Sequence, residues 1–184
     1  MIVSNHFGVA DPALLGAWIP RPVWFMAKAE LFKKQFSRWL VTSYHAFPVV
    51  RHSPDRAALR RAFDLLKRGH AVVLFPEGTR SEDGALHRAE PGAGFIARHS
   101  KSPLLPVAIT GTQRVLGRGH LVPRPAPVSI RFGEPFTLPQ ASPGGRPMDH
   151  QQSADFLMSK IAELLPFESQ GVYAQGSGGT QAAL

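Results

Sequence analysis

The 184-residue chain is long enough for one domain with its own hydrophobic core, and its 43% apolar and 18% charged residues are typical of a globular protein. It contains no cysteine, which excludes disulfides, thiolate metal sites and a catalytic thiol and is compatible with a reducing cytoplasm. Its net charge is +8, and the first 120 residues carry +9 against −1 for the rest. This distribution indicates an anionic partner (phosphate, an acidic lipid surface or nucleic acid) or simply an arginine-rich, soluble surface.

Five short runs of apolar or β-branched residues, each bounded by glycine, proline or charge, predict β-strands. They are residues 1–4, 44–50, 71–75, 104–110 and 128–132. Several of these runs are apolar at every position, as expected for strands that are covered on both faces of a sheet.

Helical patterns lie between these strands. A first helix is expected to open at Asp11-Pro12 and to continue through Trp18, and a second to have Ser53 as its N-cap, Pro54 at its first position and Gly69 as its stop. Two more are expected over 92–99 and 154–165. The alternation of strands and helices predicts an α/β fold, in which helices flank a mostly parallel sheet in a single layered domain.

The domain boundaries follow from composition. Residues 1–139 are expected to form the core, and residues 140–170 a linker and a C-terminal helix that complete the same domain. Residues 171–184 are rich in Gly, Gln, Ser and Ala, which predicts a disordered tail.

The first cluster of chemically active residues follows the first strand. His6 stands at the end of the strand, and Asp11 at the helix start can meet it across the turn that Gly8 permits. The carboxylate would accept the Nδ1 proton and leave Nε2 of the imidazole as a base. The pair includes no nucleophile, so the substrate's own hydroxyl would have to attack. An N-capping aspartate beside a polar loop histidine would give the same spacing without a function.

The second cluster is Phe-Pro-Glu-Gly-Thr-Arg-Ser at 75–81, directly after an apolar strand. Open α/β sheets bind their ligands at the carboxyl ends of strands. Gly78 and Thr79 offer backbone N–H groups as an anion nest, and Arg80 offers a fork for phosphate. Glu77 would hold the geometry of Arg80 or bind a substrate hydroxyl. The alternative is a surface turn closed by an exposed Arg–Glu pair.

Two more blocks complete the pattern. Phe-Pro-Val-Val-Arg at 47–51 passes from a strand to Arg51 ahead of a helix. Residues 102–108 form an apolar strand bracketed by prolines, and we interpret it as a wall of the site rather than a source of reagents. The other histidines show no metal-ligand spacing.

In this order, the blocks at 6–11, 47–51, 75–81 and 103–108 resemble the lysophosphatidate acyltransferase (1-acyl-sn-glycerol-3-phosphate O-acyltransferase) family of the glycerolipid acyltransferases. The resemblance covers about residues 1 to 135, and the combination of Asn-His-x4-Asp with Phe-Pro-Glu-Gly-Thr-Arg is highly specific. It implies a glycerol-phosphate acyltransferase-like fold.

The resemblance also implies roles for single residues. His6 would be the general base on the acceptor hydroxyl and Asp11 its orienting partner. The acceptor's glycerol phosphate would be bound by Lys28, Arg51, Glu77, Gly78, Thr79 and Arg80. The acyl group would pass directly from acyl-CoA or acyl-carrier protein to the free hydroxyl of a lysophospholipid, most simply 1-acyl-glycerol-3-phosphate giving phosphatidate, with no covalent acyl-enzyme, no metal and no cofactor.

The chain departs from the family pattern in two places. Family members usually carry a small hydroxyl residue where this chain has Gly8. Relatives also carry N-terminal helices that dock on the membrane, whereas this chain begins five residues before His6. Either the start is truncated, or the aromatic and basic segment 18–39 makes the contact, with Trp18, Ile19, Val23, Trp24, Phe25, Phe32, Phe36 and Trp39 beside Lys33, Lys34 and Arg38. A core helix with a solvated basic edge is the alternative for this segment.

These observations define the expected location and partners. No run approaches the roughly 20 apolar residues of a membrane-spanning helix, and the N-terminus lacks the pattern of a signal peptide. We expect a cytoplasmic protein that is peripheral on the inner face of the cell membrane, with a lysophospholipid acceptor, an acyl thioester donor and the membrane surface as partners and no nucleic acid. The alternative is a catalytically degenerate or non-enzymatic basic module that binds anionic lipid or nucleic acid.

Overall fold

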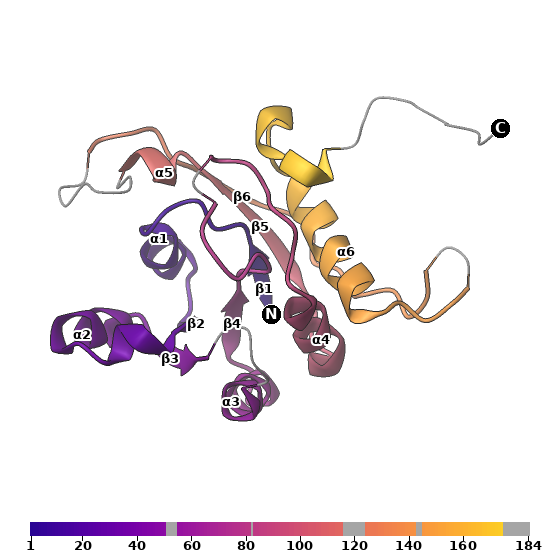
Figure 1. The fold of residues 1–184 in the computed structure, drawn as a ribbon, viewed down its shortest axis with the longest axis horizontal. Coiled ribbons are helices and arrows are strands. Elements are labelled where there is room, and N and C mark those ends of the chain that lie inside the picture. The colour runs from indigo at the N-terminus through magenta and orange to yellow at the C-terminus, as the bar shows by residue number, and fades with distance from the viewer. Residues whose placement is uncertain (51–54, 82, 116–123, 143–144, 175–184) are drawn as a thin grey trace.

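One six-stranded sheet organises the chain. The computed structural model describes residues 1–50, 55–81, 83–115, 124–142 and 145–174. The strands lie in the order β3-β2-β4-β1-β5-β6, and all neighbours are parallel except β5 and β6. Their bounds are β1 (Ile2–Ser4), β2 (Val23–Lys28), β3 (Ala46–Val49), β4 (Ala71–Leu74), β5 (Leu105–Thr110) and β6 (Ser129–Phe132). The predicted α/β class with a mostly parallel sheet is confirmed (Figure 1).

Helices fill the connections between the strands. They are α1 (Asp11–Trp18), α2 (Gln35–Ser43), α3 (Arg56–Lys67), α4 (Pro91–Ser100), α5 (Thr112–Val115) and α6 (His150–Ala162), with 3-10 turns η1 (Ala29–Phe32), η2 (Phe167–Ser169) and η3 (Gly171–Tyr173). Helix α3 begins after Asp55, whose carboxylate accepts the amides of Ala57 and Ala58. The N-cap is therefore Asp55, and the predicted cap and first residue, Ser53 and Pro54, lie outside the described residues.

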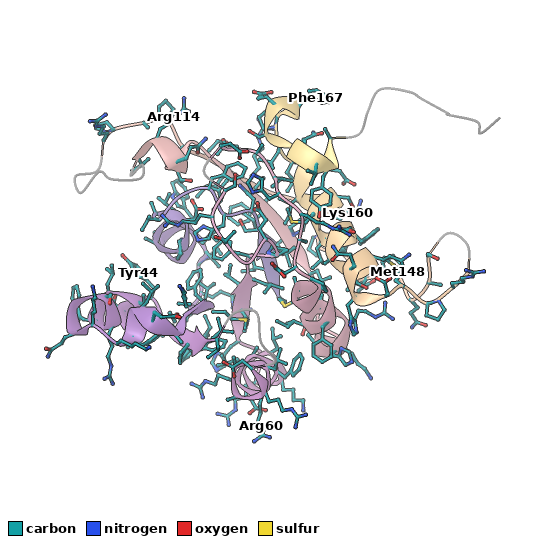
Figure 2. The ribbon with its side chains drawn as sticks, viewed as in Figure 1. Tyr44, Arg60, Arg114, Met148, Lys160 and Phe167 are labelled. Atoms are coloured by element: carbon teal, nitrogen blue, oxygen red, sulfur yellow. The ribbon has the colours of Figure 1, made fainter. Side chains whose placement is uncertain are left out.

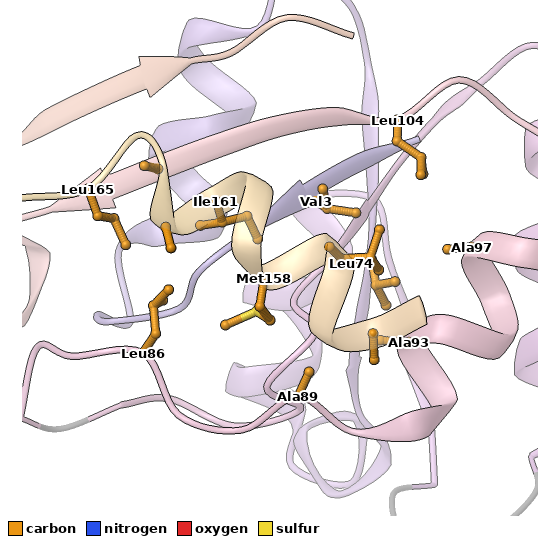
Figure 3. Close-up of a cluster of buried hydrophobic side chains, with 14 of the residues drawn as sticks. Val3, Leu74, Leu86, Ala89, Ala93, Ala97, Leu104, Met158, Ile161 and Leu165 are labelled. Carbon is orange, nitrogen blue, oxygen red and sulfur yellow. The ribbon is translucent and has the colours of Figure 1, made fainter. Parts of the chain in front are cut away.

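The two faces of the sheet are covered by different helices because neighbouring side chains on a strand point to opposite faces. Val3 and Leu74 pack with α4 and α6, as Figure 3 shows. Ile2 and Val73, one position away, pack on the other face with Leu15 of α1. Helix α3 covers the outer part of the first face, where its Ala58, Ala62 and Leu65 contact Phe47 and Val72.

The segment 18–39 differs from its prediction because it contains strand β2, which sequence reasoning missed. Strand β2 pairs with β3 on one side and β4 on the other. Val23 and Phe25 are consequently buried in the core, where Ile19 joins them, and none of the three is available to a membrane. Trp24 lies between Val23 and Phe25, so the strand is apolar from Val23 to Ala27 and does not show the alternation of apolar and polar residues that predicts a strand.

The end of the described chain also differs from its prediction. Gly171, Val172 and Tyr173, which were assigned to a disordered tail, form the turn η3 and bond to residues 86–89. The composition of the tail concealed this because Tyr173 is the residue that anchors the turn. Residues 175–184 lie outside the described residues.

Candidate active site

Three strand ends meet at one edge of the sheet, and they build the site. Strand β1 lies between β4 and β5, with Val3 opposite Leu74 on one side and Pro106 on the other. Because these strands are parallel, the segments that follow them emerge at the same edge. His6, the 75–81 block and residues 111–112 are therefore brought together.

The predicted pair of His6 and Asp11 is present. Asp11 is fully buried at the start of α1, and its Oδ2 lies 2.8 Å from Nδ1 of His6. The same oxygen accepts the backbone amides of Phe7 and Gly8, each at 2.8 Å. The carboxylate thus folds the turn back on itself and holds the imidazole through a single atom.

This arrangement determines which nitrogen of His6 is available. Oδ2 of Asp11 already accepts two amide protons, so the network assigns the Nδ1 proton of His6 to the bond with Asp11. Nε2 then carries the lone pair that a base requires. The ring stacks on Phe75 with a centroid distance of 4.3 Å, and the side chain of His6 is 13% exposed. The ring is fixed in orientation and still reachable at its edge.

Glu77 has a different position from the one expected. It is only 3% exposed, and its two oxygens accept backbone amides, Oε1 from His6 at 3.2 Å and Oε2 from His87 at 3.0 Å. Within the described chain its carboxylate makes no hydrogen bond or ion pair with Arg80, so it does not hold the arginine's geometry. Glu77 thus connects two segments, the turn that contains His6 and the segment 83–90.

The environment of Glu77 changes its acidity. Burial raises the pKa of the Glu77 carboxyl to about 7, and the amides of His87 and His6 oppose that rise. Asp83, nearby on the surface, behaves in the opposite way, because hydrogen bonds from His87 and Ser81 hold the pKa of its carboxyl well below its usual range. The bond to Asp83 in turn raises the pKa of His87.

Asn5 is a positioning residue to which sequence reasoning assigned no role. It is fully buried, its Nδ2 donates to the carbonyl of Ile109 at 2.7 Å, and its Oδ1 accepts the amide of Ile109 at 2.8 Å. The side chain thereby ties the end of β1 to β5 just before His6. Its place immediately before the histidine in the Asn-His-x4-Asp block was the available signal.

The missing hydroxyl at Gly8 has a structural explanation. A Cβ at Gly8 would lie 2.7 Å from the Cβ, carbonyl carbon and carbonyl oxygen of Thr112, which follows β5. Thr112 is fully buried, and its hydroxyl has no hydrogen-bond partner within the described part of the chain. Another segment therefore occupies the space that a side chain would need.

The residues predicted to bind phosphate are distributed along the same edge. Thr79 and Arg80 are exposed after β4, and Lys28 is exposed at the carboxyl end of β2, the neighbour of β4. Lys28 lies 3.9 Å from Glu30 in an exposed ion pair. Gly78 has a φ of 67° and donates its amide to Phe75 within the turn, so that N–H is not available to an anion. Arg51 lies outside the described residues.

The 103–108 block lies largely in the buried strand β5, in agreement with the buried strand that the sequence predicted. Leu104, Val107 and Ala108 are buried between the helices on the two faces. Among the described residues no group of three or more His, Asp or Glu side chains could hold a metal ion, and no helix has both the length and the hydrophobicity to cross a bilayer.

Similar proteins agree with this site. A family model described as Acyltransferase matches residues 1–110, which is more than half of the chain. The 1-acyl-sn-glycerol-3-phosphate acyltransferase of Bacillus subtilis (strain 168) is 41% identical over 113 residues, which cover 60% of this chain and 55% of that protein. The protein of the same name from Streptococcus pneumoniae (strain ATCC BAA-255 / R6) is 30% identical over 140 residues, which cover 75% of this chain and 50% of that protein. The chain thus spans about half the length of the curated relatives it matches.

A solved structure shares the fold. The crystal structure of the 1-acyl-sn-glycerophosphate (LPA) acyltransferase PlsC from Thermotoga maritima matches with a TM-score of 0.69 and 28% sequence identity. The match covers 89% of this chain and 64% of that one. The family model includes β1 through β5 and therefore every strand that contributes to the site. On both sequence and fold, this chain belongs to the Acyltransferase family.

Proposed function

We propose that this chain transfers an acyl group from a thioester, carried by coenzyme A or acyl-carrier protein, to the free hydroxyl of 1-acyl-glycerol-3-phosphate. The observation that carries the proposal is the single oxygen of Asp11 that holds His6 Nδ1 and two turn amides. It leaves Nε2 as a base of fixed direction at the edge of the sheet. The names of the relatives supply the substrate class.

The proposed reaction needs no nucleophile from the protein. Nε2 of His6 takes the proton of the acceptor hydroxyl as its oxygen attacks the thioester carbonyl. The tetrahedral intermediate expels the thiolate, which takes the proton back from the imidazolium, so an ester and a free thiol are formed. A positioned base of this kind contributes about 10²–10⁴-fold to a rate. Asp11 stabilises the imidazolium that exists between the two proton transfers.

The acceptor's phosphate is the natural ligand for the cations at the same edge. Arg80 follows β4 and Lys28 ends β2, so both lie on the β4 side of the strand end that leads to His6 on β1. We assign the phosphate to these two residues and to Arg51. A guanidinium fork fits phosphate oxygens in pairs, and a fixed phosphate would place the acceptor hydroxyl relative to the base.

The lipid substrates require contact with a membrane, and we propose that η1 and α2 provide it, together with the end of α1. Trp18 and Trp39 are 69% and 67% exposed. Exposed Leu31 and Leu40 accompany them, beside the exposed cations Lys33, Lys34 and Arg38. Apolar side chains with cations around them are typical of segments that lie in the interface of a bilayer. Cations of this kind favour an anionic leaflet, and this supports our proposal that the protein binds the inner face of the cell membrane.

The test is a turnover assay with the purified protein. It combines acyl-CoA or acyl-carrier protein with a panel of acceptors (lysophosphatidate, glycerol 3-phosphate and phosphate-free monoacylglycerol) and follows release of the free thiol and formation of the ester. We expect both products together, and most with lysophosphatidate. Thiol release without ester would indicate hydrolysis, and absence of both would leave the chain as a basic module that binds anionic lipid.

A further inference from the structure

The last described segment of the chain is bound to the loop that leads to Glu77. The amide of Leu86 donates to the carbonyl of Ser169 at 3.0 Å, and the amide of Val172 donates to the carbonyl of Leu86 at 3.2 Å. A Cβ at Gly171 would overlap the Leu86 carbonyl oxygen. The fit is thus close enough that the position between the two bonds requires glycine, which also has a positive φ of 52°.

Tyr173 makes a second connection between the same two segments. Its hydroxyl accepts the amide of Ala89 at 2.9 Å and donates to Oδ1 of Asp155 on α6 at 2.7 Å. Gln151, one turn earlier on α6, donates both to that Oδ1 at 2.9 Å and to the carbonyl of Ala89 at 3.1 Å. The backbone of Ala89 is therefore held at both its N–H and its C=O.

Leu86 provides the apolar part of this connection. It is fully buried and belongs to the cluster formed by α4, α6 and the sheet, where Met158 and Leu165 also lie (Figure 3). Both ends of the span 86–89 are consequently fixed by residues that follow position 150 in the sequence.

His87 lies between these two fixed points, and its amide is the donor to Oε2 of Glu77. The other oxygen of Glu77 accepts the amide of His6. A continuous path of hydrogen bonds thus connects the C-terminal segment to the backbone of the histidine, through residues 86–89 and one buried carboxylate. The family model ends at residue 110, so it does not include the segment from which this path starts.

We propose that the C-terminal segment 169–173 is a latch that positions His6, and that Tyr173 is its principal positioning residue. The latch touches neither substrate nor the reacting atoms. It holds residues 86–89 at the distance from Glu77 at which one carboxylate spans the amides of His87 and His6. This inference rests on the proposed transfer reaction for its kinetic consequence, but its structural part is independent of it.

The experiment compares Tyr173→Phe with the wild type and with Tyr44→Phe. The control makes the same chemical change at the other tyrosine, whose hydroxyl has no hydrogen bond within the described residues and which lies on the α2 side of the molecule (Figure 2). We expect Tyr173→Phe to accelerate amide hydrogen exchange at Ala89 and His87 by at least about tenfold. Turnover is expected to fall about three- to tenfold in kcat with KM unchanged, because the phosphate-binding side chains are not touched.

The titration of the Glu77 carboxyl, followed by NMR, is a readout that a general loss of stability would not move. Loss of the His87 amide removes one of the two hydrogen bonds that favour ionised Glu77, so the pKa of this carboxyl is expected to rise in Tyr173→Phe and not in Tyr44→Phe. The charges of His87 and Asp83 also act on Glu77, and the variant leaves both residues in place. Gly171→Ala, which displaces the same segment without removing a hydroxyl, is expected to reproduce the changes in exchange and in kcat.

The outcomes separate the latch from the proposed reaction. Faster exchange at Ala89 alone, with His87 and kcat unchanged, would overturn the positioning role and leave a local hydrogen bond. A wild type without turnover would contradict the transfer reaction only. In that case the latch would still be tested by the His87 exchange and by the NMR shift of the His6 imidazole, which is expected to change in Tyr173→Phe and not in Tyr44→Phe.

Discussion

One oxygen of Glu77 accepts a hydrogen bond from the backbone amide of His6 at 3.2 Å, across a separation of 71 residues in the chain. The carboxylate therefore holds the backbone of the proposed base, whereas Asp11 holds its ring. The two carboxylates have separate tasks. Changes at Asp11 should act on the tautomer of His6, and changes at Glu77 on its position.

The His6→Ala variant should lose at least about two orders of magnitude in kcat, because no other group in the turn can take the acceptor proton. The variant should still fold, because Asp11 keeps the amides of Phe7 and Gly8, but its melting temperature should fall because the contacts of the ring with Asp11 and Phe75 are lost. His70→Ala is a suitable control, because that exposed histidine precedes β4 at the opposite edge of the sheet. Retained turnover in His6→Ala would remove the mechanism.

The Glu77→Gln variant should change how stability depends on pH. The folded state raises the pKa of this carboxyl from 4.5 to about 7, so it binds the proton more tightly than the unfolded chain does. The stabilising contribution is present below the unfolded value and is lost as pH rises through the folded value, by on the order of 3 kcal/mol in total. Glutamine cannot ionise, so its own contribution does not change with pH. The free energy of unfolding in urea should therefore fall for the wild type relative to the variant as the pH rises from about 4.5 to about 7.5. A constant difference over that range would contradict the assignment.

The Arg80→Lys variant should act through the acceptor's phosphate. An ammonium cannot reproduce a guanidinium fork, so kcat/KM with lysophosphatidate should fall at least about tenfold, the discrimination of one charge-assisted hydrogen bond. A phosphate-free monoacylglycerol should show much less change. Arg60→Lys, on α3 (Figure 2), is the matched substitution at another exposed arginine. Equal losses with both acceptors would make Arg80 a structural residue.

The two glycines at Gly8 and Gly16 should respond in opposite ways to alanine. A Cβ at Gly8 would lie 2.7 Å from Thr112, and two of the three nearest atoms belong to backbone, so Gly8→Ala should cost about 1–3 kcal/mol of stability. Turnover should fall as well, because the amide of Gly8 bonds to Asp11. Gly16 lies in α1, and no atom lies within 4 Å of the position that a Cβ would take there. Gly16→Ala should therefore stabilise the folded protein by about 0.5–1 kcal/mol. Chemical denaturation and the turnover assay measure both, and equal stabilities would show that Thr112 gives way.

Replacing Lys33, Lys34 and Arg38 by glutamine should weaken binding to anionic vesicles. Each cation near such a surface contributes on the order of 1 kcal/mol, and the effect should shrink at high salt because the interaction is screened. Turnover of a short-chain acceptor in detergent should persist. The matched control removes three positive charges from α3 instead, by replacing Arg56, Arg60 and Lys67 with glutamine. If the two triple variants sediment equally with vesicles at low and high salt, the docking surface is not at η1 and α2.

The local sequence determined the part of the site that lies within one turn. His6 and Asp11 are five residues apart, and the end of β1, Gly8 and the start of α1 fix the path between them. The alternation of strands and helices likewise predicted the layered sheet. Dihedral preferences and hydrogen bonds over such short spans are encoded by the residues themselves, which is why these predictions agree with the structure.

Contacts between distant segments were decided only by the tertiary structure. The task of Glu77 depends on β1 lying beside β4, and strand order is not contained in hydrophobic periodicity. Strand β2 escaped prediction because its place between β3 and β4, and the packing of Val23 and Phe25 on Leu15 of α1, are contacts with other segments and not a local pattern. Tyr173 looks like part of a polar tail until Ala89 and Asp155 provide the partners for its hydroxyl. In each case the role of the residue depends on a segment that is distant in the sequence and buries it in the fold. The sequence specifies the residue, but which segment packs against it is decided by the tertiary structure.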